Sequence, residues 1–190
     1  MTTEIRQATP GDVELLLQVI DEASEGVLPA LWAEFAPEGV DPGEIGRAMV
    51  LAEEGPFSHR AAAVIERDGK ALGAVIGYPL TGEPDEDPVP PAFEPIKAME
   101  AQMTGDWYVN MVAVLPEGRG QGLGAGLMAE TETLARAAGC PAVALIVAAT
   151  NTGATGFYRH LGFTERDRCP FDVSVYGHEP TEALLMVKPL

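Results

Sequence analysis

The spacing of apolar residues predicts several helices in the first part of the chain. Thr9 followed by Pro10 is a favoured helix start, and Asp12 falls in the expected first turn. The apolar residues that follow recur at helical spacing up to about Ser24, and they are Val13, Leu16, Leu17 and Ile20. Two further helical segments are predicted around residues 31–35 and 42–52.

Runs of apolar and β-branched residues indicate the strands. A short first strand is expected over residues 4–8. Residues 61–66 and 71–78 flank the pair Asp68-Gly69, which predicts a two-residue turn between two antiparallel strands. Later strands are expected at residues 106–115, 142–147, 163–168 and 183–187.

Two longer helices are predicted among the later strands, at residues 122–138 and 152–160. The residues expected to share the buried face of the first are Leu123, Leu127, Leu134 and Ala138. One early hairpin, with strands and helices mixed after it, predicts an α/β (α+β) fold in which a mixed sheet has helices on both faces. We expect a single domain over residues 1–190, because a domain typically has roughly 100–200 residues.

An insertion interrupts this pattern at residues 79–105. Residues 79–95 contain six prolines and five acidic residues, so they cannot hold a regular element. A short helix is expected after them, at residues 96–103. Loops of this length are often lids or binding loops and are otherwise disordered, and the sequence leaves both interpretations open.

The clearest chemical signal is a glycine-rich turn between the strand at 106–115 and the helix that follows. Residues 116–124 read Pro-Glu-Gly-Arg-Gly-Gln-Gly-Leu-Gly. Successive backbone N–H groups at a helix N-terminus form an anion site, and glycine lets a phosphate approach the backbone closely. Arg119 adds a guanidinium that can bind phosphate oxygens in bidentate fashion. This turn therefore predicts a ligand that carries phosphate.

Two common phosphate-binding motifs do not match this turn. A Walker A loop needs Lys and then Ser or Thr after its last glycine, whereas Ala125 and Gly126 follow Gly124. A Rossmann loop needs an acidic residue near the end of the next strand, but residues 146–150 contain none. Both nucleotide-binding readings are therefore disfavoured.

Residues 112–124 resemble the central motif of the GNAT-type N-acetyltransferases. Arg119, Gly122 and Gly124 match the Q/R-x-x-G-x-G/A signature of that family. Residues 151–163 match its second segment, N-x-x-A-x-x-F-Y-x-x-L-G-F, and one helix and one strand separate the two motifs as they do in the family. The strict match covers residues 107–165. It implies a GNAT-like, mostly antiparallel sheet with a splayed central pair of parallel strands.

The resemblance implies acetyl-CoA as cosubstrate. In such enzymes the pantetheine arm lies between the two parallel strands, here at 106–115 and 142–147, and pairs with backbone groups as an extra strand would. The pyrophosphate sits on the N–H groups of the glycine-rich turn. The residues implied to bind the cosubstrate are Val112, Ala113, Val114, Arg119, Gly120, Gln121, Gly122, Leu123, Gly124, Asn151 and Phe157.

Three residues are implied to act in catalysis. Tyr158 stands where the family places a tyrosine general acid for the leaving thiolate, although packing in an aromatic core pair is the alternative. Tyr108 and Asn110 occupy strand positions where some members carry Glu or His. Because neither is a good base at neutral pH, they are expected to orient a water or the acceptor amine. The proton would leave through water to bulk solvent or to an acid, either Asp106 at the far end of the same strand face or Glu94 or Glu100 of the insertion.

The net charge of −17 limits the choice of partners. Residues 1–105 hold 20 acidic and 6 basic residues, and residues 106–190 hold 9 and 6. Such a polyanion is a poor candidate for binding nucleic acid or an anionic membrane. The acidic first half is either an ordinary solubilising surface or a surface for a cationic acceptor, such as a small amine or a peptide amine.

The remaining composition adds few constraints. No signal peptide or membrane-length apolar run is visible, and the two cysteines have no redox or metal spacing, which favours a cytoplasmic protein with reduced thiols. The three histidines are scattered, so no metal is expected. The family resemblance is compatible with a homodimer. An alternative function is a non-catalytic module on the same fold that binds acyl-CoA as a sensor or interaction domain.

Overall fold

The computed structural model describes residues 2–82 and 89–190. Its strands follow the order β1-β2-β3-β4-β5-β7-β6. They are β1 (Thr3–Gln7), β2 (Ala62–Arg67), β3 (Lys70–Pro79), β4 (Trp107–Val114), β5 (Ala142–Ala148), β6 (Thr164–Phe171) and β7 (Thr181–Pro189). Antiparallel pairing joins β1–β2, β2–β3, β5–β7 and β6–β7, whereas β4 and β5 are parallel. This confirms the predicted mixed, mostly antiparallel sheet with one parallel pair.

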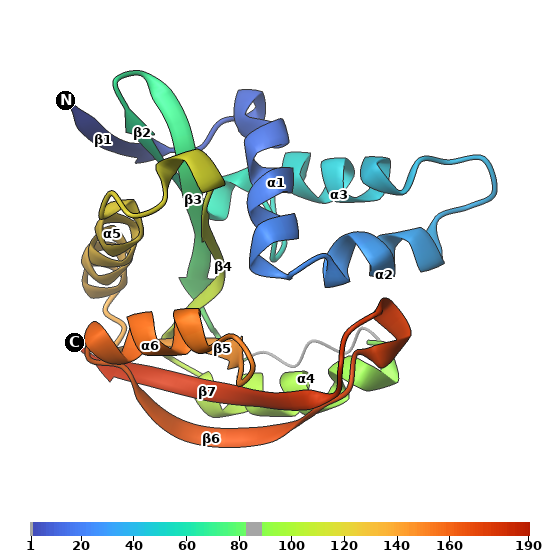
Figure 1. Ribbon diagram of the computed structural model, residues 1–190. Helices are drawn as coiled ribbons and strands as arrows, with labels where there is room; N and C mark the ends of the chain where they lie inside the picture. The colour runs from blue at the N-terminus through green and yellow to red at the C-terminus, as the bar shows by residue number, and fades with distance from the viewer. Residues whose placement is uncertain (1, 83–88) are drawn as a thin grey trace. The chain divides into compact units, whose positions relative to one another are not determined.

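The helices predicted from the sequence are present within a few residues of their expected ends (Figure 1). They are α1 (Val13–Ala23), α2 (Val27–Phe35), α3 (Pro42–Leu51), α4 (Glu94–Glu100), α5 (Leu123–Ala137) and α6 (Thr152–His160). Part of the expected insertion, residues 83–88, lies outside the described residues. A lid there stays a prediction.

The chain folds as two compact units. The first comprises Met1–Gly77 and Asn110–Thr131, and the second comprises Tyr78–Val109 and Glu132–Leu190. Strands β3 and β4 and helix α5 contribute residues to both. The expectation of a single domain over residues 1–190 remains a prediction.

The first unit is organised around the β2–β3 hairpin. Asp68 and Gly69 have φ angles of 51° and 78°, so the two-residue turn has the left-handed conformation that the Asp-Gly pair predicted. One face of the hairpin, which includes Val64 and Ile76, packs on α1, α2 and α3 in an apolar core. On the other face, the side chain of Ile65 approaches Gly126 of α5. Helices therefore cover both faces of the sheet in this unit.

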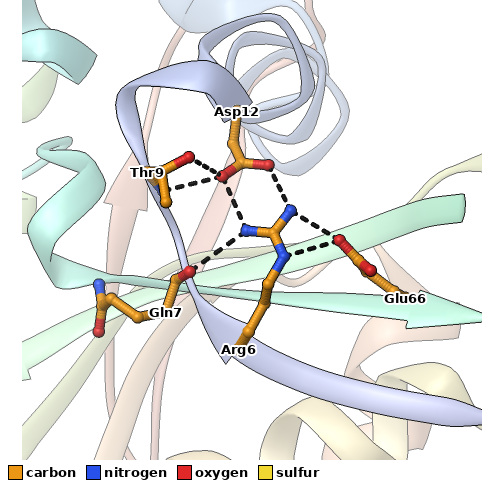
Figure 2. Close-up of polar contacts among 5 residues, drawn as sticks. All are labelled: Arg6, Gln7, Thr9, Asp12 and Glu66. Carbon is orange, nitrogen blue, oxygen red and sulfur yellow. Dashed lines mark hydrogen bonds and ion pairs between the residues drawn. The ribbon is translucent and has the colours of Figure 1, made fainter. Parts of the chain in front are cut away.

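A cluster of charged side chains ties β1, β2 and the start of α1 together (Figure 2). The Arg6 guanidinium donates to both carboxylate oxygens of Asp12, at 2.7 and 2.8 Å, and to Glu66 at 2.7 Å. The backbone N–H and the hydroxyl of Thr9 donate to the same Asp12 carboxylate, at 2.8 and 2.9 Å. Asp12 thereby joins the helix start that the Thr9-Pro10 pattern predicted to the edge of the sheet.

The second unit has its own apolar core. Its strands are β5, β7, β6 and the first residues of β4, where Trp107–Val109 pairs in parallel with Val143, Ala144 and Leu145. Met99 and Met103, from α4 and the turn after it, share a buried core with Tyr108 of β4 and with residues of β5 and β7. Part of the predicted insertion is therefore a regular element that contributes two buried side chains to this core.

The buried face of α5 differs from the prediction in its second half. Leu123 and Leu127 are buried as expected, but Leu134 is only half-buried and Ala138 is exposed beyond the helix end. Thr131 and Ala135 are buried instead. Steps of four residues from Leu123 lead through Leu127 to Thr131 and Ala135. The Thr131 hydroxyl donates to the Leu127 carbonyl at 2.9 Å, which lets a polar residue occupy the buried face.

Candidate active site

The glycine-rich turn joins the end of β4 to the start of α5. After the strand, the N–H groups of Gly118 and Arg119 donate to Leu115 and Pro116 carbonyls, at 2.8 and 3.3 Å, and form a short 3-10 turn. Gly120 and Gly122 then take left-handed φ angles of 71° and 77°. In the described chain, nothing lies within 4 Å of the position where a Cβ on either glycine would be.

These observations explain the glycines. The left-handed backbone conformation requires glycine at both positions, because other residues rarely adopt such φ angles. The space beside them fits close approach of a ligand phosphate. Leu123 and Gly124 are the first residues of α5, where backbone N–H groups lack acceptors within the helix. The turn therefore has the local structure that phosphate binding requires.

Arg119 is held by two partners within the first unit. Its Nη2 forms an ion pair with Glu22 of α1 at 2.5 Å, and its Nε donates to the Val114 carbonyl at 3.1 Å. The expected contact of this guanidinium with a phosphate stays a prediction. A phosphate at that guanidinium would compete with the Glu22 carboxylate for the same donors.

The second half of β4 presents alternate residues to opposite sides. Met111 and Ala113 pack against the apolar core of the first unit. Val112 and Val114 therefore face the opposite side of the strand, since successive side chains alternate. Ala113 was also expected to bind the cosubstrate. Because its side chain is turned to the core, only its backbone groups remain for that role.

Asn110 is engaged by the loop before β2. Its side-chain Nδ2 donates to the Pro56 carbonyl at 2.7 Å. The same loop is fixed elsewhere by Ser58, which donates to the Ala52 carbonyl, and by the His59 ring, which contacts the Val50 carbonyl. The amide of Asn110 thus positions a loop, which sequence reasoning did not foresee. Its expected role in orienting the acceptor amine stays a prediction.

Tyr108 is buried in the second unit beside a carboxylate. Burial, followed by the charge of Glu100, raises the pKa of the Tyr108 hydroxyl well above 10, and a hydrogen bond with Glu100 acts in the same direction. The Tyr78 ring packs edge-on against Tyr108, with centroids 5.9 Å apart. Tyr108 is therefore a hydrogen-bond donor rather than a base. Glu100, a residue of the insertion, is the carboxylate beside this strand residue.

The second sequence motif forms α6 and its two ends. Asn151 is the N-cap, and its side-chain Oδ1 accepts from the Ala154 N–H at 3.0 Å. At the other end Gly162 takes a φ of 93°, and the Phe163 N–H donates to the Tyr158 carbonyl at 3.0 Å. The asparagine and the Leu-Gly-Phe segment thus have clear local roles in bounding the helix.

Tyr158, on α6, packs against one aromatic ring of the same helix and one that follows it. The Phe157 and Phe163 ring centroids lie 5.4 and 5.8 Å from that of Tyr158. Phe157 is half-buried, whereas Tyr158 is buried, and burial raises the pKa of its hydroxyl to about 12. The hydroxyl therefore carries its proton at neutral pH, as a general acid must.

Two other features bear on the function. No group of three or more His, Cys, Asp or Glu side chains suited to a metal ion occurs among residues 2–82 and 89–190. In the same residues, no helix combines the length and the apolar character needed to cross a membrane.

The family assignment follows from comparison with known proteins. Residues 28–163 match the model of the acetyltransferase (GNAT) family. The chain belongs to the GNAT acetyltransferases. This match extends beyond the strict motif region at 107–165 and includes α2, α3 and the hairpin. No curated protein matches the chain.

Two of the solved structures that share the GNAT fold align over nearly the whole chain, and a third aligns over part of it. An acetyltransferase aligns at 19% identity with a TM-score of 0.68, covering 98% of each chain. A ribosomal-protein-alanine N-acetyltransferase from Brucella melitensis aligns at 23% identity and a TM-score of 0.63, covering 98% of this chain and 99% of that one. A Bacillus anthracis protein in complex with acetyl coenzyme A aligns at 16% identity and a TM-score of 0.50, covering 68% and 61%.

Proposed function

We propose that this GNAT protein transfers an acetyl group from acetyl-CoA to a primary amine by direct attack. The observation that carries the proposal is the glycine-rich turn, where Gly120 and Gly122 take left-handed conformations immediately before α5. The open space beside both glycines supports a phosphate-bearing cosubstrate. The family to which the chain belongs supports acetyl transfer.

Different residues of the chain are proposed to bind different parts of acetyl-CoA. Backbone N–H groups from Gly120 to Gly124 hold the pyrophosphate, because the Arg119 N–H donates to the Pro116 carbonyl and only the Arg119 guanidinium remains for a phosphate. Backbone groups of Val112, Ala113 and Val114 hold the pantetheine arm. Asn151 and Phe157 are proposed to contact the same molecule. When bound, acetyl-CoA supplies a thioester carbonyl that an amine can attack. A backbone N–H near Val112 donates to the carbonyl oxygen as negative charge develops there.

Tyr158 is the proposed general acid. Its hydroxyl has a pKa of about 12 because it is buried, whereas a thiol has an ordinary pKa of roughly 8.5. The leaving thiolate gains a proton from Tyr158 during the step, and solvent then returns the tyrosine to its protonated state. The large pKa keeps Tyr158 protonated at neutral pH. Because it exceeds the pKa of a thiol, full transfer of the proton to sulfur is uphill, so solvent must return a proton to the tyrosine as the step ends.

The acceptor proton is proposed to leave through Tyr108 and Glu100. The Tyr108 hydroxyl donates to the Glu100 carboxylate and can accept a proton from a water or the attacking amine at the same moment. This uses Glu100, one of the two insertion acids expected from the sequence, without requiring a tyrosinate. Asn110 is proposed to orient the acceptor.

The acceptor is proposed to be a cationic small amine or a peptide amine. The acidic first half of the chain supports positive charge on the acceptor. A ribosomal-protein-alanine N-acetyltransferase with the same fold is consistent with a peptide amine. We propose a cytoplasmic location, in keeping with the free thiols of Cys140 and Cys169. A homodimer is the oligomer that the family resemblance favours.

The test is thiol release from acetyl-CoA across a panel of amines. Wild type is expected to release thiol only with one class of amine, and Tyr158→Phe is expected to lower kcat on the order of 10²-fold, the usual contribution of a general acid. Tyr176→Phe is the matched control, because it removes a hydroxyl elsewhere in the second unit.

The alternative is an acyl-CoA-binding module without catalysis. The absence of a base on β4 at Tyr108 and Asn110 is the observation that favours it. Measurable CoA binding with no thiol release from any amine would establish the module and contradict the transferase. Equal kcat in wild type and Tyr158→Phe would remove the proposed acid while leaving the transferase intact.

A further inference from the structure

An arginine from the β2–β3 hairpin forms hydrogen bonds with the glycine-rich turn. Arg67, the last residue of β2, donates from Nη1 to the side-chain Oε1 of Gln121 at 2.5 Å and from Nη2 to the Gln121 backbone carbonyl at 3.2 Å. Its Nε donates to the hydroxyl of Thr3, which is its register partner on β1, at 3.2 Å. The guanidinium is therefore fixed at three points, on the sheet and on the turn.

The hydrogen bond from Arg67 to the Gln121 carbonyl determines the direction of a neighbouring N–H. The Gln121 C=O and the Gly122 N–H belong to one peptide unit, and no cis peptide bond occurs in the described chain. In a planar trans peptide these two groups point in opposite directions. Because the carbonyl is turned toward Arg67, the Gly122 N–H is turned away from the hairpin.

This direction matters because the turn is intrinsically soft. Gln121 lies between Gly120 and Gly122, which can adopt many backbone conformations at little energetic expense. Other contacts restrain the same turn. Gln121 Nε2 donates to the Glu117 carbonyl at 2.9 Å, and the Glu117 carboxylate pairs with Lys70 at 3.1 Å. The cations on either side of the Asp68-Gly69 turn therefore hold both ends of the phosphate-binding segment.

We infer that Arg67 is a positioning residue for the phosphate cradle: it acts through Gln121 to keep the Gly122 N–H directed at the pyrophosphate. This inference rests on the proposed binding of acetyl-CoA at the turn. Arg67 lowers the entropic expense of ordering the turn when the ligand binds, which is the general effect of preorganisation. Its two donors to Gln121 form a fork that a lysine cannot reproduce.

The experiment measures CoA binding by calorimetry for wild type, Arg67→Ala, Arg67→Lys and Arg60→Ala. Arg60→Ala is the matched control, because it removes the same charge from an exposed ion pair, with Glu53, in the same unit. The Tm of each variant is recorded alongside. Arg67→Ala is expected to weaken CoA binding about tenfold, which is the size of effect expected when charge-assisted hydrogen bonds are removed. Arg60→Ala is expected to bind as wild type does.

A second readout separates positioning from general damage. The ratio of kcat/KM for acetyl-CoA to that for acetyl-pantetheine, which lacks the pyrophosphate, is expected to fall in Arg67→Ala by the same factor as CoA binding. An equal fall with both donors would show a general structural role and overturn the inference. Full recovery of CoA binding in Arg67→Lys would overturn it too, because charge alone would then suffice.

The same experiments test the proposed acetyl transfer independently of the role of Arg67. Wild type that binds CoA in an Arg67-dependent manner but releases no thiol would keep the positioning role and reject the transfer reaction. Thiol release by wild type with unchanged CoA binding in Arg67→Ala would keep the reaction and reject the positioning role. Wild type that binds no CoA at all would overturn both.

Discussion

Asp12 joins the first helix to the sheet through its carboxylate. The Arg6 guanidinium holds the pKa of Asp12 well below its usual range, and hydrogen bonds from Thr9 act in the same direction. Asp12 is almost fully buried, whereas Arg6 is partly exposed, so solvent weakens the ion pair in part. The group nevertheless contributes to stability wherever it is ionised.

The pH dependence of unfolding tests this contribution. The folded pKa of Asp12 lies below an unfolded value of about 3.9, so its stabilisation is fully present above that value and is lost progressively as the pH falls from there toward the folded pKa. Asp12→Asn is expected to lower the free energy of unfolding at pH 7 by roughly 2 kcal/mol, in line with hydrogen bonds to charged groups. Below about pH 4 the stability of the variant is expected to fall less steeply than that of wild type.

Denaturant unfolding at a series of pH values measures both effects. Asp21→Asn is the control, because it neutralises an exposed carboxylate on the same helix. Parallel pH profiles for wild type and Asp12→Asn would contradict the assignment.

At the residue scale, several partners of the site residues could not be read from the sequence. The pairs Arg67–Gln121 and Glu22–Arg119 join residues 54 and 97 positions apart. A sequence pattern shows that an arginine is present, but not which carboxylate or carbonyl its long side chain reaches. The fork of Arg67 could have been suspected only from its place beside the predicted hairpin turn.

At the element scale, α2 and α3 cross at a glycine. Gly46 is buried on α3, and a Cβ there would lie 2.2 Å from the Trp32 ring of α2. Trp32 in turn packs edge-on against Phe57, with centroids 6.4 Å apart. The indole therefore cannot move aside without disturbing the core of the first unit. Packing therefore requires glycine at position 46, although alanine has the higher helix propensity.

Gly46→Ala is expected to destabilise the protein by about 1–3 kcal/mol, because overpacking outweighs the better helix propensity of alanine. Gly43→Ala in the same helix is the control. A Cβ at Gly43 would meet Asp41 at an ordinary 3.4 Å, so no loss of stability is expected there. Thermal unfolding of both variants measures the difference. A Tm for Gly46→Ala at or above that of wild type would show that Trp32 can relax.

Element boundaries were largely predictable, and one helix face was not. The Asp-Gly turn, the capped start of α1 and the glycine that ends α6 are local signals, each set by backbone conformations that few residues can adopt. The buried face of α5 depends on what packs against it. A polar Thr131 is buried there because its hydroxyl is satisfied within the helix, which apolar periodicity alone does not reveal.

At the scale of the whole molecule, charge is the dominant feature. Residues 13–55, which include α1, α2 and α3, contain ten acidic residues and one basic residue. A surface of this composition attracts cations and accelerates their encounter at low ionic strength. This supports the proposed cationic acceptor.

Salt dependence tests the role of this charge. For a polyamine acceptor, kcat/KM is expected to fall several-fold between about 0.05 M and about 0.5 M salt, since the Debye length shrinks to a few ångströms. A neutral amino acid amide, measured alongside, is expected to change little. Anionic or neutral amines that outperform every polyamine would assign the acidic surface to solubility alone.

The sequence by itself determined the order of elements, the glycine-rich turn and the family resemblance. These depend on short-range patterns: apolar periodicity, turn residues with left-handed φ angles, and motif spacing. Only the tertiary structure decided that Glu100 meets Tyr108, that Asn110 holds Pro56 and that Arg67 turns the Gln121 peptide. Such contacts depend on strand register and on the reach of side chains between elements far apart in the chain, and neither leaves a periodic trace in the sequence.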